Sequence, residues 1–256
     1  MEERLSAEPS IVMSPTLDIP AVLLVGGMGT RLRSVLPSAP KPLASVGNHS
    51  FLELLVRQLR NQGIRRLVMC SGYLADQIEH TFGDGRAWNV SIEHSKEERP
   101  LGTAGALKLA QKHLLNASEF LVMNGDSFLE VDFSQLVCFH RGQNGLASMA
   151  VVPVQDAGRY GTVCVGSGGR VTGFAEKIGG GASGLINAGV YVFDQKIFDF
   201  IPEGPASLEK DVFPRILDLG IYALEQRGMF IDIGTPEDYA RAQALCARLC
   251  NAAFGE

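Results

Sequence analysis

The chain has 256 residues, of which 46% are hydrophobic and 20% charged, and its formal net charge is −5. This length and composition are typical of one large globular α/β domain with a buried core. The sequence lacks an apolar run of the about 20 residues that cross a bilayer, which excludes a membrane-spanning protein, and it lacks the basic stripe of a nucleic-acid binder.

The start of the chain and its cysteines indicate a cytoplasmic protein. Residues 1–18 are acidic in part and lack the apolar stretch of a signal peptide, so we expect a flexible N-terminal extension. The five cysteines form neither a CxxC pair nor a zinc-type array. Their odd number and mostly apolar neighbours favour reduced thiols packed in the core.

The first half of the chain alternates apolar, β-branched runs with amphipathic stretches. Such an order predicts a parallel sheet with helices on both faces. The expected strands are residues 21–25, 65–72, 90–95 and 119–123, and the expected helices are residues 51–60, 74–82 and 103–112.

After about residue 145 the pattern changes to short strands separated by glycine-rich turns, which predicts antiparallel strands added to the sheet. The last predicted helix has a strong start, with Thr235 as N-cap, Pro236 at its first position and Asp238 at its third. The expected strands here are residues 147–154, 161–166, 170–176, 188–193, 222–226 and 228–233, and the expected helices are residues 208–219 and 236–249.

A glycine-rich segment with basic residues follows the first predicted strand. Gly26, Gly27 and Gly29 let backbone N–H groups approach an anion closely, and the helical turn that follows adds its positive end. Arg31 and Lys41 can then neutralise the charge of a triphosphate as pyrophosphate leaves. The alternative for so short a motif is a tight turn with solvated basic residues.

Two other phosphate-binding motifs are excluded by their spacing. A dinucleotide fingerprint needs a third glycine, but Leu32 stands where that glycine would be. A P-loop needs a Gly-Lys pair, and the sequence contains none.

Residues 95–110 form a second candidate region. A Pro-Leu-Gly-Thr run leads into a predicted helix, and a base or ribose could lie flat against Gly102 and Gly105. The Glu97 carboxylate can accept hydrogen bonds from the N1–H and the N2 amine of guanine. A charged loop with a helix cap at Thr103 explains these residues equally well when they are taken alone.

Two aspartates follow apolar strands. Asp126 comes just after the strand at 119–123, and Asp232 lies at the end of the strand at 228–233. The carboxyl ends of parallel strands are the usual ligand side of an open α/β sheet. Two carboxylates together with triphosphate oxygens and water would suit Mg²⁺, although a single aspartate there can simply cap a helix.

A further polar group is dispersed over the second half of the chain. Tyr160 and Gly161, Glu176 and Lys177, and Asn187 lie at the edges of predicted strands. Glu176 and Asn187 could bind sugar hydroxyls, and Lys177 could bind a sugar phosphate. Taken singly, each is better explained as an exposed turn or strand residue.

Together these motifs resemble those of the sugar-nucleotide pyrophosphorylases, the nucleotidyltransferases that make nucleotide sugars. The similarity runs from about Ile19 to Ala247, and it is carried in order by GGMGTRLR, PKPL, PLGTAGAL, NGDS, GRYGTV, FAEK, INAGVYVF, SLEKDVFP and FIDIGTPEDY. The resemblance implies a Rossmann-like mixed, mostly parallel sheet flanked by helices. We expect a single domain over residues 19–250, with a nucleotide-binding half to about residue 145 and a sugar-binding half from about residue 146.

The resemblance also implies roles for individual residues and a Mg²⁺ cofactor. Catalytic roles are expected for Arg31, Lys41 and Asp126, and metal binding for Asp126 and Asp232. The expected nucleotide contacts are Val25, Gly26, Gly27, Gly29, Thr30, Glu97, Pro100, Gly102 and Thr103. The expected sugar-phosphate contacts are Tyr160, Gly161, Glu176, Lys177 and Asn187.

Within this family, GGMGTRLR, ERPLGTAGALKLA and the short C-terminus are most similar to the D-glycero-α-D-manno-heptose-1-phosphate guanylyltransferases. The implied reaction joins GTP and a heptose 1-phosphate into GDP-heptose and pyrophosphate, for bacterial capsule or surface glycan synthesis. The alternatives are a mannose-1-phosphate guanylyltransferase, which usually carries a further C-terminal domain, and a glucose-1-phosphate nucleotidyltransferase that uses another nucleotide.

Two other classes of function are less favoured. A catalytically silent nucleotide-sugar sensor would be expected to lack Arg31, Lys41 or one of the two aspartates, and all are present. An NAD-dependent oxidoreductase is disfavoured by the missing third glycine. Because members of the family often form dimers or tetramers, the apolar C-terminal helix is a candidate contact in a homo-oligomer.

Overall fold

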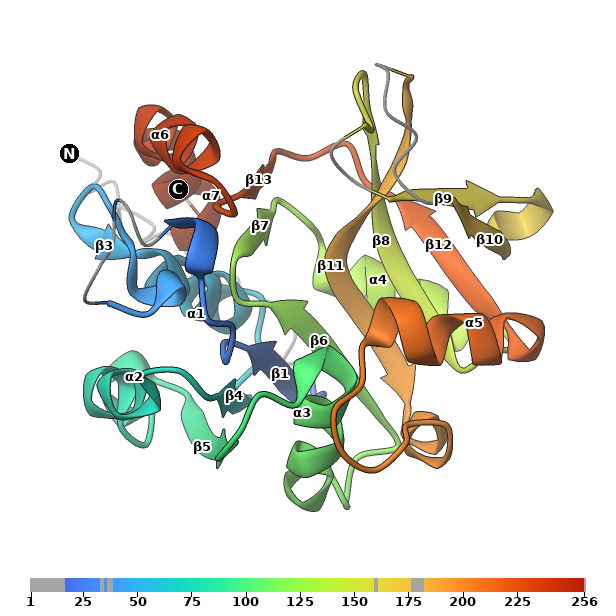
Figure 1. The fold of residues 1–256 in the computed structure, drawn as a ribbon, viewed down its shortest axis with the longest axis horizontal. Helices are drawn as coiled ribbons and strands as arrows, with labels where there is room; N and C mark the ends of the chain where they lie inside the picture. The colour runs from blue at the N-terminus through green and yellow to red at the C-terminus, as the bar shows by residue number, and fades with distance from the viewer. Residues whose placement is uncertain (1–16, 33–34, 36–38, 159–160, 176–181, 256) are drawn as a thin grey trace, which may run out of the picture.

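In the computed structural model, which describes residues 17–32, 35, 39–158, 161–175 and 182–255, nine strands form one mixed sheet with helices against both faces (Figure 1). The N-terminal extension expected at residues 1–18 lies almost entirely outside the described residues. The expected mixed, mostly parallel sheet flanked by helices is confirmed in its architecture.

The first half of the chain supplies the parallel part of the sheet. Strand β1 lies between β4 and β6, and β5 pairs with β4 at the edge, all in parallel register. The strands are β1 (Ala21–Leu24), β4 (Arg66–Ser71), β5 (Ser91–Lys96) and β6 (Glu119–Asn124), and the helices between them are α1 (Phe51–Asn61), α2 (Ala75–Phe82) and α3 (Gly102–Ala110).

Burial on both faces explains why β1 is apolar throughout. Ala21 and Leu23 belong to the core on one side of the sheet, and Val22 belongs to the core on the other. All three side chains are fully buried. Successive residues of a strand point to opposite faces, so a strand covered on both sides needs an unbroken apolar run.

The second half of the chain adds antiparallel strands, as expected, with one exception. Strand β11 runs antiparallel to β6, β8 and β9, whereas β12 runs parallel to β8. The carboxyl end of β11 lies beside the start of β8. Strand β12 begins at that same end of the sheet and therefore runs in the direction of β8. The strands are β8 (Ala147–Val154), β9 (Thr162–Val165), β10 (Val171–Ala175), β11 (Gly184–Asp194) and β12 (Ile221–Glu225).

Several elements were not expected from the sequence. Helix α4 (Phe133–Arg141) begins at Asp132, whose side chain accepts a hydrogen bond from Gln135 N–H. Strand β7 (Ser127–Leu129) pairs antiparallel with β13 (Phe230–Asp232) in a small second sheet. A hairpin is formed by β2 (Ser45–Val46) and β3 (His49–Ser50).

The two helices expected near the C-terminus are each divided. Residues 208–219 form a π-helical turn (Leu208–Val212), a short helix α5 (Phe213–Ile216) and a 3-10 turn (Leu217–Leu219). The other becomes α6 (Pro236–Ala244) and α7 (Cys246–Phe254). The start of α6 is confirmed, because Thr235 accepts a hydrogen bond from Asp238 N–H and Pro236 follows it.

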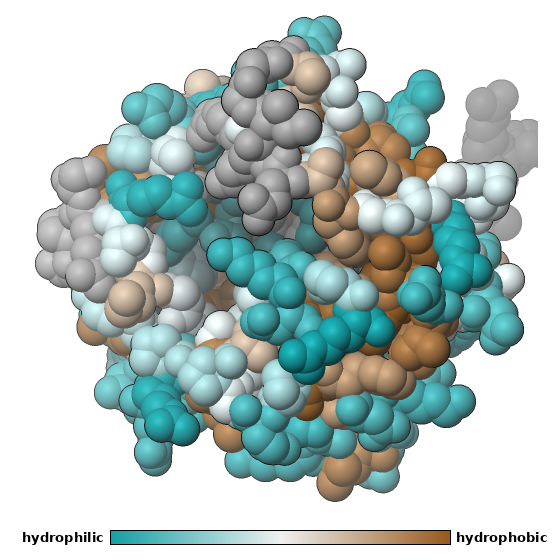
Figure 2. All heavy atoms as spheres, turned by 45° about the vertical axis from the view of Figure 1, so that its right-hand side comes forward, coloured by the Kyte–Doolittle hydropathy of each residue, from teal (hydrophilic) through white to brown (hydrophobic). Residues whose placement is uncertain are grey.

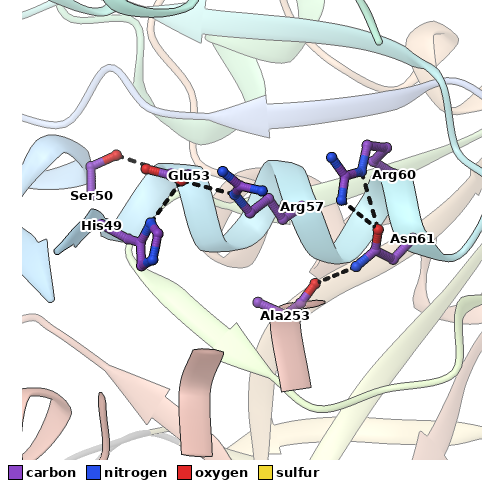
Figure 3. A network of polar contacts seen from close by, with 7 residues as sticks. All are labelled: His49, Ser50, Glu53, Arg57, Arg60, Asn61 and Ala253. Atoms are coloured by element: carbon purple, nitrogen blue, oxygen red, sulfur yellow. Dashed lines mark hydrogen bonds and ion pairs between the residues drawn. The ribbon is translucent and has the colours of Figure 1, made fainter. Parts of the chain in front are cut away.

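Helix α7 is held against α1 by a polar contact, drawn in Figure 3, and by a contact between an arginine and an aromatic ring. Asn61 Nδ2 donates to the carbonyl of Ala253 at 2.9 Å. The Arg57 guanidinium, which donates to Glu53, also lies 4.8 Å from the ring centre of Phe254. None of these residues has a predicted role in substrate binding or catalysis, so we assign the contacts to stability of the fold.

The face of the molecule shown in Figure 2 is mostly hydrophilic, with hydrophobic side chains gathered towards one side of the view. Leu115 and Leu219 are among the exposed large hydrophobic residues, with 64% and 47% of their surface accessible. None of the helices in the described part of the chain has the length and apolarity needed to cross a bilayer.

Candidate active site

A cavity of about 270 Å³ opens at the carboxyl ends of the parallel strands. The segments that leave β1, β5 and β6 contribute to it, together with the start of α3. This is the edge at which open α/β sheets usually bind ligands. The cavity is lined by Leu24, Val25, Gly26, Gly27, Met28, Lys41, Pro42, Cys70, Glu97, Pro100, Gly102, Thr103, Ala106, Asn124, Gly125 and Asp126.

Most of the nucleotide contacts expected from the sequence meet in this cavity. Its lining includes Val25, Gly26, Gly27, Glu97, Pro100, Gly102 and Thr103, as well as Lys41 and Asp126. The lining does not include Gly29, Thr30 and Arg31, the last two of which lie in a 3-10 turn (Thr30–Leu32) with Arg31 exposed.

The glycines after β1 have different neighbours. A Cβ on Gly27 would meet no atom within 4 Å, which leaves that backbone open. A Cβ on Gly26 would lie 2.9 Å from Oε1 of Glu97, and one on Gly72 would lie 2.4 Å from the same oxygen. Gly26 and Gly72 therefore allow the Glu97 carboxylate to sit between two strand ends.

Glu97 is held in the cavity by its surroundings. Its Oε2 accepts a hydrogen bond from Leu101 N–H at 3.0 Å. Burial raises the pKa of Glu97 above its ordinary value, and the Leu101 bond partly opposes this effect. The carboxylate is thus fixed in position at the cavity wall with part of its capacity to accept hydrogen bonds unused.

The glycines at the start of α3 pack against the chain itself. A Cβ on Gly102, whose φ is +70°, would lie 2.5 Å from the carbonyl oxygen of Ala206, and one on Gly105 would lie 2.4 Å from that of Gly204. The expectation that a base or ribose lies flat against Gly105 is therefore wrong, because residues 204–206 occupy that face. Gly102 still lines the cavity.

Thr103 lines the cavity, but its hydroxyl is engaged elsewhere. Thr103 Oγ1 donates to Glu209 at 3.2 Å and accepts from Leu208 N–H at 2.8 Å. A helix cap at Thr103 is not formed, since α3 begins at Gly102 without a side-chain cap. The hydroxyl instead ties the start of α3 to the π-helical turn.

The two predicted metal-binding aspartates lie close together. The pairing of β7 with β13 sets Asp232 opposite Ser127, the residue after Asp126. Ser127 Oγ donates to Asp232 at 3.1 Å and lies 3.4 Å from Oδ1 of Asp126. Lys41 Nζ donates to Oδ2 of Asp126 at 2.8 Å, so one lysine and two carboxylates form a cluster.

The cluster contains two carboxylates and one lysine, so its charges do not cancel. Burial and the nearby Asp126 carboxylate raise the pKa of Asp232 above its ordinary value. Lys41 and hydrogen bonds from Gly234 N–H and Ser127 act in the opposite direction. Two carboxylates that share one lysine retain net negative charge, which favours a further cation. No group of three or more His, Cys, Asp or Glu side chains suited to a metal is present among the residues that the structure describes.

The expected sugar-phosphate contacts are only partly described. Tyr160, Glu176 and Lys177 lie outside the described residues, and Gly161 is exposed just before β9. Asn187 lies in β11, and its Nδ2 donates to the Tyr191 hydroxyl at 2.7 Å. The same strand contacts the site, because a Cβ on Gly189 would lie 2.5 Å from Nδ2 of Asn124.

Sequence reasoning overlooked several residues at the cavity. Cys70 and Ala106 line it, and both had the appearance of ordinary core residues. Asn124 also lines it, and Asn124 Oδ1 is one of the buried atoms without a hydrogen-bond partner among the described residues.

Leu74, which follows the turn at Gly72, has a left-handed backbone conformation with a φ of +54°. The sequence gives no reason to expect this conformation, because leucine rarely adopts it.

Residues 20–248 match the protein family described as nucleotidyl transferase. The mannose-1-phosphate guanylyltransferase of Mycobacterium tuberculosis is 38% identical over 233 residues, which are 90% of this chain and 65% of that protein. The chain thus spans a little under two thirds of the length of this relative.

Two solved structures are similar in fold. HddC from Yersinia pseudotuberculosis, in complex with GMP-PN, has a TM-score of 0.79 at 34% identity, with 88% of this chain and 98% of that chain covered. UDP-glucose pyrophosphorylase from Acinetobacter baumannii has a TM-score of 0.77 at 22% identity, with 88% of this chain and 92% of that chain covered. The second likeness concerns the fold alone.

Proposed function

Because the chain belongs to the nucleotidyl transferase family, we propose that it joins GTP to a sugar 1-phosphate and releases pyrophosphate. The observation that carries this proposal is that one cavity is lined by the loop after β1 and by Lys41, Glu97 and Asp126. The expected resemblance to the nucleotidyltransferases is confirmed at the level of the family.

The choice of GTP is supported by Glu97 and by one structural relative. The carboxylate, held between Gly26 and Gly72, is suited to accept hydrogen bonds from the N1–H and N2 amine of guanine. HddC, a relative of similar fold, was solved with GMP-PN. Adenine lacks this pair of donors, so a fixed carboxylate would disfavour it.

Glu97→Gln is expected to lower kcat/KM for GTP by about 10- to 100-fold and to leave kcat/KM for ATP nearly unchanged. The amide of glutamine presents one acceptor and one donor, and it therefore cannot accept both guanine hydrogens. Steady-state pyrophosphate release with each nucleotide measures the ratio of kcat/KM for GTP to kcat/KM for ATP.

Glu98→Gln, a change at the exposed neighbouring residue, is the matched control and should keep the preference for GTP. If Glu97→Gln also keeps that preference, Glu97 only anchors Leu101 and does not read the base.

The proposed reaction is an in-line displacement at the α-phosphorus of GTP. An oxygen of the sugar 1-phosphate forms the new bond to phosphorus, and the bond to the bridging oxygen breaks, so that pyrophosphate leaves with the electron pair. The attacking phosphate is already ionised and needs no general base. Lys41 and the open backbone at Gly27 would hold the triphosphate, and Arg31 would reach it from the neighbouring turn.

The Lys41 cluster fits a Mg²⁺ ion. Asp126 and Asp232 would hold it, since magnesium typically takes one or two protein carboxylates and completes its shell with phosphate oxygens and water. Burial and the Asp126 carboxylate raise the pKa of Asp232, and two carboxylates beside one lysine carry a net negative charge that supports binding of a cation. Bound there, Mg²⁺ would neutralise and orient the phosphate oxygens.

Asp232→Asn is expected to raise the thermal midpoint of the metal-free protein at neutral pH by about 2–4 °C, the shift that about 1 kcal/mol gives in a chain of this size. The folded-state pKa of Asp232 is raised, so the ionised group destabilises the fold above that pKa and has no such effect below its ordinary pKa. The gain should therefore shrink as the pH is lowered.

The same variant tests metal binding without an activity assay. Millimolar MgCl₂ should raise the midpoint of the unchanged protein and have much less effect on Asp232→Asn. An equal rise in both proteins would remove Asp232 from the metal site.

For the sugar, we propose a D-glycero-α-D-manno-heptose 1-phosphate, which would place the enzyme in bacterial capsule or surface glycan synthesis. The motifs in GGMGTRLR and ERPLGTAGALKLA support this choice. Mannose 1-phosphate is the second candidate, because the Mycobacterium tuberculosis relative is named as a mannose-1-phosphate guanylyltransferase. Comparing kcat/KM for the two sugar phosphates with GTP decides between them.

A further inference from the structure

Strand β11 is irregular where it carries Asn187. Its register with β8 shifts between Asn187 and Tyr191, and Gly189 within this bulge has a φ of +72°. Asn187 Oδ1 accepts a hydrogen bond from Gly189 N–H at 3.0 Å. Bulges beside active sites commonly re-aim a side chain, and this one fixes the Asn187 amide at both ends.

The second end of the Asn187 amide is held by a buried tyrosine. Asn187 Nδ2 donates to the Tyr191 hydroxyl at 2.7 Å, and Tyr191 is fully buried. Burial raises the pKa of Tyr191 well above its ordinary value, as do the charge of Glu209 and a hydrogen bond to it, whereas the bond from Asn187 lowers it. The Tyr191 hydroxyl thus accepts from Asn187 and faces the Glu209 carboxylate, to which it can donate.

Glu209 is the common acceptor of this network. Ser207 Oγ donates to Oε2 of Glu209 at 2.8 Å, and Thr103 Oγ1 donates to the same oxygen at 3.2 Å. The carboxylate lies in the π-helical turn Leu208–Val212. Single π-helical turns are rare and occur often at functional sites, where they place a side chain that a regular helix would turn away.

The directions of these hydrogen bonds form a relay. A carboxylate only accepts, so Glu209 orients the Tyr191 hydroxyl as a donor towards itself. The tyrosine oxygen must then accept, which selects the NH₂ end of the Asn187 amide. An amide nitrogen carries two hydrogens, and one of them is left to donate to a sugar hydroxyl.

We propose that Glu209 and Tyr191 are positioning residues that hold the Asn187 amide ready for the sugar and tie it to Thr103 on the nucleotide side. This inference rests on the proposed function for its kinetic consequence, but the relay itself is a property of the fold. Neither Glu209 nor Tyr191 lines the cavity. Glu209 connects Tyr191, on the proposed sugar side, with Thr103, on the proposed nucleotide side.

Kinetics tests the consequence. Tyr191→Phe should raise KM for the sugar 1-phosphate about tenfold and change KM for GTP less than about twofold, because only the branch to Asn187 is cut. Glu209→Gln should raise both KM values, because it disturbs Thr103 as well. In an Asn187→Ala background, Tyr191→Phe should have almost no further effect on KM for the sugar 1-phosphate.

Two outcomes of the kinetic experiment contradict the proposal. If Tyr191→Phe lowers the thermal midpoint but leaves both KM values unchanged, the hydroxyl serves stability alone. If its effect on KM is the same in the presence and absence of Asn187, it does not act through that amide. Tyr222→Phe, on β12, is the matched control for loss of a tyrosine hydroxyl and should leave both KM values unchanged.

Nuclear magnetic resonance tests the relay without any turnover. The two side-chain amide resonances of Asn187, assigned by their loss in Asn187→Asp, should move in Tyr191→Phe and in Glu209→Gln but not in Tyr222→Phe or Glu225→Gln. Unmoved resonances in Glu209→Gln overturn the relay. If the unchanged protein releases no pyrophosphate with any nucleotide and sugar phosphate, the proposed function fails, and the resonances alone decide the relay.

Discussion

Asp126→Asn is expected to lower the rate of pyrophosphate release by about a thousandfold while the protein stays folded. Asp126 lies at the cavity, accepts from Lys41 at 2.8 Å and shares Ser127 with Asp232. Asparagine keeps the size of the side chain but removes the charge that would hold Mg²⁺. The stabilisation by MgCl₂ should therefore be lost together with turnover.

Asp199→Asn is the matched control, since Asp199 is exposed at the end of a 3-10 turn (Gln195–Asp199) and should tolerate the change with full activity. Circular dichroism and the thermal midpoint show whether each variant is folded. Near-normal pyrophosphate release from folded Asp126→Asn would contradict the metal assignment.

Lys41→Met is expected to lower kcat/KM by about 100- to 1,000-fold and, in contrast, to strengthen the binding of Mg²⁺. Only 11% of the Lys41 side chain is exposed, and its ammonium group pairs with Asp126. During the reaction that charge would move to the triphosphate and leave the aspartates to the metal. Without Lys41 the two carboxylates lose the ammonium group that partly neutralises them, so MgCl₂ should stabilise the variant more than the unchanged protein.

The opposite signs of the two effects separate a lysine that acts on the triphosphate from one that merely supports the fold. Lys196→Met, an exposed lysine in the turn after β11, is the control for loss of an ammonium group. If Lys41→Met loses turnover and the response to MgCl₂ together, Lys41 maintains the aspartate pair, and its proposed contact with the triphosphate is wrong.

The parallel half of the fold could be predicted because its signals are local. The apolar run at β1 and the amphipathic run at α1 each identify an element without reference to the rest of the chain. The start of α6 is similar, since the cap at Thr235 depends only on residues that follow it closely. Helix α4 was overlooked, although its cap at Asp132 is of the same local kind.

The candidate site was predictable in its parts but not in its assembly. Asp126 and Asp232 were both expected at strand ends, but their contact depends on the pairing of β7 with β13, two short strands that lie far apart in sequence. The role of Gly105 was misjudged for the same reason, because the segment packed on it comes from residue 204 onwards. Glu209 lies in SLEKDVFP, one of the segments that carry the family resemblance, but no role for it was predicted, because a polar residue in a helical pattern is usually part of a solvated face.

The most direct test of the central claim is pyrophosphate release by the unchanged protein, with each of the four nucleoside triphosphates crossed with heptose, mannose and glucose 1-phosphates in the presence of MgCl₂. The proposed function predicts release with GTP, highest with the heptose 1-phosphate and matched by an equal amount of GDP-sugar. Release with UTP or dTTP but not with GTP would contradict the assignment of guanine to Glu97. No release with any pair would contradict the enzyme itself.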